Sequence, residues 1–239
     1  MTYRRLLREH ARTLGRALIP SLAAAVLLSS TVLHAQGAVR GQIRLIDRPG
    51  VSAGSLRDVV LSLEPERPTS APAWLSKVSV GMKQREFEPH VQIVAAGGSV
   101  AYPNQDPFSH NVFSNSSLGA FDLGLYRSGK TRAATFTSPG VYAVYCNIHA
   151  RMVNYVIAVR TPYVTRAQGN GTFAIERVPA GNYTLRVWHE RASEHVEVLR
   201  VPAEGLTSVT LALDARGYTP SAHTNKFGQP YAATRADRY

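Results

Sequence analysis

The sequence contains a single cysteine, Cys146, among its 239 residues. One cysteine excludes a disulfide within the chain and any cage of several cysteines around zinc or an iron–sulfur cluster. The sequence also lacks the GxGxxG, P-loop, GxSxG and HExxH patterns. Those patterns mark dinucleotide-binding, phosphate-binding, serine-hydrolase and metalloprotease sites, so the sequence offers no support for these four classes.

Negative charge is scarce, with 16 Asp and Glu against 27 Lys and Arg and a net charge of +11. Much of the positive charge lies at the ends of the chain. Residues 1–35 carry five Arg and one Glu, and residues 215–239 carry three Arg, one Lys and one Asp. Residues 36–214 therefore keep a charge of only +4. Because helix-borne DNA-binding motifs are also missing, we expect no nucleic-acid partner.

The longest apolar stretch runs from Ala17 to Leu33, after five arginines and before a small residue, Ala35. A basic start, an apolar middle and a small residue before the polar remainder predict a secretory signal peptide over residues 1–35. The alternative is an uncleaved membrane anchor, but Pro20 and several Ser dilute a stretch that is short of about 20 apolar residues. We therefore expect a periplasmic protein with no stable membrane insertion after cleavage.

Helix signals are nearly absent between the two ends, whereas strand signals recur. Residues 38–45 alternate apolar and polar side chains, which is typical of a half-buried strand. Similar candidates follow at residues 58–63, 91–95, 99–102, 135–137, 141–146, 154–159, 172–175, 183–188, 195–201 and 208–213. Short strands separated by Gly, Pro and Asn turns predict an all-β sandwich or barrel. The pattern stops after these strands, and we expect a disordered tail over residues 215–239.

The strand candidate GVYAVYC ends on Cys146, and His149 and Met152 follow it in a C-x2-H-x2-M spacing. His110 lies upstream, where a loop meets a strand candidate in NQDPFSHNVF. Taken alone, a buried cysteine is usually inert, and a single histidine or methionine is usually structural. Together, one thiolate, two imidazoles and a thioether are the ligands of a trigonal copper site with a weak axial sulfur. An unpaired thiol in an exported protein also needs a reason to persist.

The other histidines give weaker signals. His90 lies just before a strand candidate, and we interpret it as a packing residue. His189 and His195 flank a predicted turn and lack a third ligand, so we interpret them as structural. Multicopper oxidases and reductases need further sets of histidine ligands. We therefore expect that the protein is not an enzyme.

The segments FEPHVQIVAAGGSVAYPNQDPFSHNVFS and FTSPGVYAVYCNIHARM resemble the cupredoxins, the blue-copper proteins that include plastocyanin, pseudoazurin and amicyanin. The resemblance implies a Greek-key β-sandwich over residues 78–160 with one type 1 copper ion. It implies a role beside the ligands for Asn111, which would tie the ligand loop to the adjacent strand. A longer string that includes FDLGLYRSG is similar to bacterial proteins labelled methylamine utilization protein, which implies an electron-transfer setting. The copper ligands implied by the resemblance are His110, Cys146, His149 and Met152.

A second resemblance covers much of the remaining chain. The string GNGTFAIERVPAGNYTLRVWHE, residues 169–190, is similar to the later strands of a carboxypeptidase-regulatory-like, transthyretin-like β-sandwich. Val39–Leu45 and Asp58–Leu63 resemble its early strands. The resemblance implies one sandwich built from residues 38–66 and 162–214, with the cupredoxin inserted between its halves. The alternative is two sandwiches in series, of which the first begins near Gly37.

These features predict a periplasmic one-electron carrier. In cupredoxins the electron passes through the exposed edge of the C-terminal histidine, which implies this role for His149. Ile148 and Ala150 would supply apolar contact, and Arg151 would favour an acidic patch on a redox partner such as a cytochrome or a periplasmic dehydrogenase. Two alternatives stay open, a copper-delivery or copper-storage protein and a non-redox interaction module in which copper is only structural.

Overall fold

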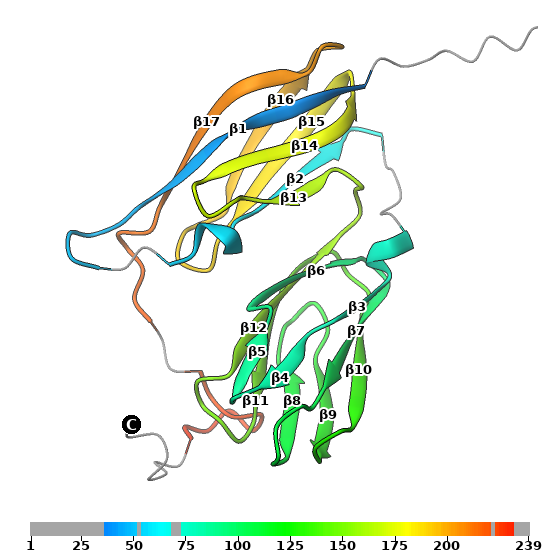
Figure 1. The fold of residues 1–239 in the computed structure, drawn as a ribbon, viewed down its shortest axis with the longest axis vertical. Helices are drawn as coiled ribbons and strands as arrows, with labels where there is room; N and C mark the ends of the chain where they lie inside the picture. The colour runs from blue at the N-terminus through cyan, green and yellow to red at the C-terminus, as the bar shows by residue number, and fades with distance from the viewer. Residues whose placement is uncertain (1–35, 52–53, 68–72, 221–222, 232–239) are drawn as a thin grey trace, which may run out of the picture. The chain divides into compact units, whose positions relative to one another are not determined.

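The structure is a computed structural model that describes residues 36–51, 54–67, 73–220 and 223–231 (Figure 1). The predicted signal peptide lies outside these residues. Strands dominate, and the helical elements in the described part are the short 3-10 turns η1 (Leu56–Asp58) and η2 (Ala73–Leu75). Neither of these described helices is long and apolar enough to cross a membrane. The prediction of an all-β fold is confirmed.

Strands from both ends of the described chain form one β-sandwich, which we call the terminal sandwich. Its two sheets have the strand orders β14-β1-β17 and β13-β2-β15-β16. Strand β1 is antiparallel to β14 and parallel to β17, and β2 is antiparallel to β13 and β15. Early and late segments therefore share the same sheets. The strands are β1 (Gln36–Ile46), β2 (Val60–Pro65), β13 (Val164–Arg166), β14 (Thr172–Pro179), β15 (Gly181–Trp188), β16 (His195–Val201) and β17 (Leu206–Asp214).

The core of the terminal sandwich follows from the two-residue period of its strands. In β15, the side chains of Tyr183, Leu185 and Val187 are buried, and the residues between them are partly exposed. Val39 and Ile43 of β1 are buried in the same cluster from the other sheet. Removal of these apolar side chains from water is the main force that holds the two sheets together.

The intervening strands form a second β-sandwich, which we call the central sandwich. Its sheets have the strand orders β10-β7-β3 and β6-β12-β11-β8-β9, and β4 and β5 form a separate hairpin. Figure 1 shows these strands in cyan to green. The strands are β3 (Lys77–Ser79), β4 (Gly81–Lys83), β5 (Glu86–Glu88), β6 (Val91–Ala95), β7 (Gly98–Pro103), β8 (His110–Ser114), β9 (Phe121–Tyr126), β10 (Thr131–Phe136), β11 (Gly140–Cys146) and β12 (Val153–Val159).

Strand β11 shows how the central sandwich positions its cysteine. Tyr142, Val144 and Cys146 are buried at alternate positions, and the residues between them are partly exposed. These side chains belong to one cluster with Tyr102 and Phe136 from the opposite sheet. The alternation along the strand therefore directs the Cys146 side chain into the interior of the sandwich.

Side chains of the two sandwiches, which lie in one unit of the chain, also contact one another. The rings of Tyr155 in β12 and Trp188 in β15 pack with their centroids 5.1 Å apart. Beside them, Nε2 of His90 lies 3.1 Å from Oε2 of Glu190. His90, which the sequence predicted as a packing residue, also packs edge-on against Tyr155 and is thus part of this contact.

The chain beyond β17 is the segment, residues 215–239, for which the sequence predicts a disordered tail. Residues 215–220 and 223–231 are described and contain turns but no strand. Lys226 and Tyr231 form hydrogen bonds with residues of the central sandwich. The contacts that hold this segment are polar and aromatic. Such contacts leave no apolar period in the sequence from which they could be predicted. Residues 221–222 and 232–239 lie outside the described part.

Candidate metal centre

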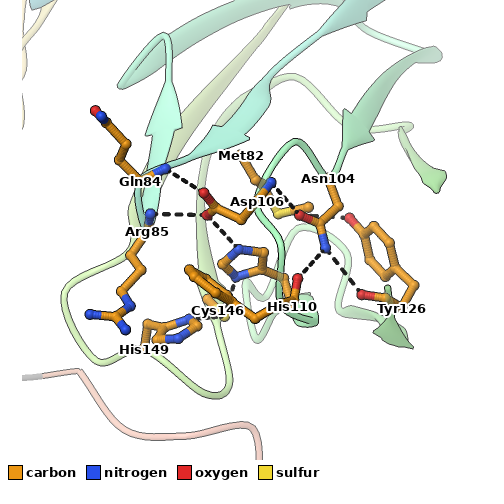
Figure 2. A network of polar contacts seen from close by, with 10 residues as sticks. Met82, Gln84, Arg85, Asn104, Asp106, His110, Tyr126, Cys146 and His149 are labelled. Atoms are coloured by element: carbon orange, nitrogen blue, oxygen red, sulfur yellow. Dashed lines mark hydrogen bonds and ion pairs between the residues drawn. The ribbon is translucent and has the colours of Figure 1, made fainter. Parts of the chain in front are cut away.

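Three side chains with metal-binding atoms meet at the end of the central sandwich (Figure 2). Cys146 is the last residue of β11, His149 lies in the turn that follows, and His110 begins the neighbouring strand β8. The Sγ atom of Cys146 is 3.6 Å from Nδ1 of His110 and 3.6 Å from Nδ1 of His149. All three donor atoms lie within 4.8 Å of one another, so one ion can contact all of them.

Met152 closes the turn that follows Cys146. Its N–H donates to the backbone oxygen of His149 at 3.0 Å, and its own oxygen accepts from the N–H of Cys146 at 3.2 Å. The side chain is 1% exposed and packs in the same cluster as Cys146. These backbone bonds close the turn between Cys146 and Met152. The role of Met152 as an axial ligand stays a prediction.

The surroundings of Cys146 favour its thiolate form. Burial alone would raise the pKa of the thiol, but the imidazoles of His110 and His149 and two backbone N–H groups lower it to about 5. The thiolate is the form that binds a metal ion. A thiolate beside two imidazoles fits copper, because sulfur suits Cu(I) and imidazole suits both redox states.

Asp106 holds the His110 ring from the side opposite Cys146. His110 is fully buried, and its Nε2 lies 2.9 Å from Oδ2 of Asp106. The Asp106 carboxylate also accepts the N–H of Gln84 at 2.6 Å and that of Arg85 at 3.0 Å. With Nε2 engaged by the carboxylate, Nδ1 faces Cys146, which is the arrangement of a carboxylate–histidine–metal triad.

Asn104 fixes the loop that leads from β7 to His110. Its Nδ2 donates to the backbone oxygens of Phe108 at 2.8 Å and Tyr126 at 3.3 Å. Its Oδ1 accepts the N–H of Asp106 at 3.0 Å. Figure 2 shows these hydrogen bonds of the Asn104 side chain as dashed lines. Because Asn104 is 1% exposed and uses both ends of its side chain, the loop is rigidly connected to the sandwich.

Phe108 covers both imidazoles. Its ring centroid lies 5.3 Å from that of His110 and 5.5 Å from that of His149. The Arg85 guanidinium lies over the same ring, with Cζ 5.2 Å from the centroid. One aromatic ring thus packs against both imidazoles and the Arg85 guanidinium.

Asn111 links the loop after Cys146 to two strands. Its backbone oxygen accepts the N–H of Asn147 at 2.8 Å, and its Nδ2 donates to Oδ1 of Asp122 at 2.5 Å. These bonds connect β8 with the ligand turn and with β9. The residues expected at a partner-binding surface lie in the same turn, where Ile148 is 43% exposed. Ala150 is half-buried and Arg151 is exposed.

The sequence did not identify Asp106, Asn104 or Phe108 as parts of the centre. Their only signal is their proximity to His110 in NQDPFSH, and a loop has no period that would show which side chains face the histidine. His189 and His195 are not brought together with a third ligand. Across the described ranges, the group of His110, Cys146 and His149 is the one cluster of three His, Cys, Asp or Glu donors.

No protein-family model matches the chain. A purple cupredoxin from Nitrosopumilus maritimus is 20% identical over 34% of this chain and 99% of its own, with a TM-score of 0.31. Amicyanin from Paracoccus versutus is 25% identical over 41% of this chain and 97% of its own, with a TM-score of 0.33. A reduced amicyanin mutant is 21% identical over 41% and 98%, also at 0.33. Because these scores are low, the function proposed below depends on the residues of the site.

Proposed function

We propose that the protein binds one type 1 copper ion and carries single electrons between redox partners. His110, Cys146 and His149 would hold the ion, and Met152 would be the weak axial ligand. The observation that carries this proposal is the approach of two imidazole Nδ1 atoms to one thiolate sulfur at 3.6 Å each. Copper, when bound, supplies the one-electron exchange, because this donor set accommodates both Cu(I) and Cu(II).

The chain's own contribution is to keep the donors in place. Asp106 orients the His110 ring, and the buried end of β11 orients the Cys146 sulfur. Phe108 packs against the His110 ring, and the buried Met152 packs in the same cluster as Cys146. Ligands that move little between redox states reduce the reorganisation that accompanies electron exchange, so this rigidity suits an electron carrier.

We also propose that a redox partner docks at the turn that contains His149. Ile148 offers exposed apolar surface there, and Arg151 adds an exposed positive charge. Such a surface suits a partner with an acidic patch, since opposite charges speed association and set orientation. A periplasmic cytochrome or dehydrogenase is the class of partner that this role requires.

A visible absorption spectrum tests the proposal. The purified protein should turn intensely blue with Cu(II), and a reductant should bleach the colour reversibly. Cys146→Ser should abolish the colour, whereas His195→Gln, which changes an exposed histidine in the terminal sandwich, should leave it intact. Rejection of Cu(II), or a colour that survives Cys146→Ser, would contradict the proposal. Transfer of Cu(I) to an acceptor without a blue oxidised form would indicate copper delivery or storage instead.

A further inference from the structure

Residues 223–231 follow the terminal sandwich in sequence but lie against the end of β11 in the central sandwich (Figure 1). The Tyr231 hydroxyl donates to the backbone oxygen of Cys146 at 2.7 Å. The N–H of Lys226 donates to Oδ1 of Asn147 at 2.9 Å. The segment therefore holds the metal-binding cysteine and the residue after it.

Aromatic stacking extends the contact to the residue before the cysteine. The His223 ring stacks on the Tyr145 ring with centroids 4.0 Å apart and an interplanar angle of 21°. Tyr231 packs edge-on against His223, with centroids 5.1 Å apart. Three consecutive residues of the central sandwich, with Cys146 in the middle, are thus contacted by one segment.

The segment has a folded turn of its own. Oδ1 of Asn225 accepts the N–H groups of Phe227 at 2.9 Å and Gln229 at 3.1 Å. The N–H of Asn225 donates to the oxygen of Gln229 at 2.8 Å. An asparagine that bonds to the backbone ahead of it stabilises a turn. This internal order reduces the conformational entropy that is lost when the segment packs against β11.

Lys226 also closes a ring of polar contacts. Its Nζ lies 2.7 Å from Oδ2 of Asp122, and Oδ1 of Asp122 accepts from Asn111 at 2.5 Å. The oxygen of Asn111 accepts from the N–H of Asn147 at 2.8 Å, and Oδ1 of Asn147 accepts from the N–H of Lys226. An exposed ion pair alone contributes little, but contacts that share partners reinforce one another.

This ring includes the residues that follow two of the metal-binding side chains. Asn111 follows His110, and Asn147 follows Cys146. We propose that residues 223–231 form a clamp on the metal centre, with Lys226 as a positioning residue for these two donors. This inference rests on the copper-binding function proposed above. The clamp keeps the donors in place when the metal is absent and slows the escape of bound copper.

Point variants of the full chain test the clamp. Lys226→Met removes the cation, Tyr231→Phe removes only the hydroxyl, and both are combined in a double variant. In the copper-free protein, the amide of Asn147 should exchange its hydrogen about tenfold faster in the double variant. In the copper-loaded protein, release of copper to a chelator should be about tenfold faster. Lys226→Arg, which keeps the cation, should exchange hydrogen and release copper at the wild-type rates. Lys130→Met removes another exposed lysine and should also behave as the wild type.

The two readouts separate failure of the clamp from failure of the proposed function. Unchanged exchange at Asn147 would overturn the clamp even if copper binds. Faster exchange with unchanged copper release would also overturn it, because the segment would then not position the metal ligands. Faster exchange in a protein that binds no copper would keep the contacts and contradict the copper-binding function. An equal effect of Lys130→Met would overturn the clamp in favour of a general effect of charge.

Discussion

At the scale of single residues, Asp106 determines how His110 faces the metal-binding atoms. The Asp106 side chain is buried, which alone would raise its pKa, but the N–H of Arg85, the His110 imidazole and the N–H of Gln84 lower it. The group is therefore a carboxylate whose oxygens accept three hydrogen bonds. Loss of these hydrogen bonds would cost free energy, because the charge of the carboxylate is buried. The same bonds fix the direction in which the carboxylate faces His110.

Replacement of this carboxylate by an amide should weaken the centre. In Asp106→Asn, His110 loses its charged acceptor, and we expect copper affinity to fall roughly 10- to 100-fold. The free energy of unfolding of the copper-free protein should fall by about 1–3 kcal/mol, because a buried hydrogen bond to a charged group is lost. Chelator competition and urea unfolding measure the two effects.

Asp214→Asn is the matched control for this change. Asp214 is an exposed carboxylate at the end of β17 that pairs with Arg216 in the terminal sandwich. Its replacement should leave copper affinity unchanged. Equal affinity of Asp106→Asn and the wild type would show that His110 does not depend on the carboxylate for its orientation.

At the scale of elements, the turn of the β4–β5 hairpin combines a strained backbone with hydrogen bonds to Asp106. Its two central residues, Gln84 and Arg85, have φ angles of 56° and 60°, although neither is a glycine. Left-handed backbone at both positions is the geometry of a type I′ turn. Both residues donate their N–H to the carboxylate of Asp106, so the conformation has a role at the centre.

Relief of this strain should stabilise the protein. Gln84 is exposed, so Gln84→Gly removes little besides the Cβ atom that disfavours positive φ. We expect the free energy of unfolding to rise by about 1 kcal/mol in urea titrations. Glu86→Gly, at an exposed strand position in β5, should lower it by about 1 kcal/mol. A loss of stability in both variants would mean that the turn is not strained.

The sequence predicted the parts of the fold that follow a local period and missed those that depend on tertiary contacts. The C-x2-H-x2-M spacing indicated Cys146 and His149 because one turn carries both. The three-residue strands β3, β4 and β5 are too short for a recognisable alternation. Lys226 and Asp106 have no local signal, since their partners lie on elements that only the folded chain brings near.

At the scale of the whole molecule, the His90–Glu190 pair joins the two sandwiches and should respond to pH. The hydrogen bond to Glu190 raises the pKa of His90 above its ordinary 6.5, and the same bond lowers that of Glu190 below 4.5. The stabilisation of the fold by the raised pKa of His90 is fully present below pH 6.5 and is lost as pH rises through that raised pKa. The glutamate contribution is complete above pH 4.5 and is lost as pH falls through the lowered pKa.

The pair should therefore stabilise the fold most between about pH 4.5 and pH 6.5. We expect Glu190→Gln to lower the free energy of unfolding by about 1 kcal/mol there, because both side chains keep some contact with solvent. The difference from the wild type should shrink toward pH 9, as followed by urea unfolding across pH. Glu197→Gln is the control, because Glu197 is an exposed carboxylate that pairs with His195 within β16. A difference that does not vary with pH would contradict the role of the pair.

The position of β1 between β14 and β17 has a consequence for the order of folding in time. Arg40 in β1 and Glu176 in β14 form an ion pair across 136 residues of sequence. Pairings this distant close late, because the chain must first lose the entropy of a long loop. The central sandwich depends on nearer contacts and should assemble first. Until the late strands pair with them, β1 and β2 keep unpaired edges, and we expect these edges to be open to aggregation.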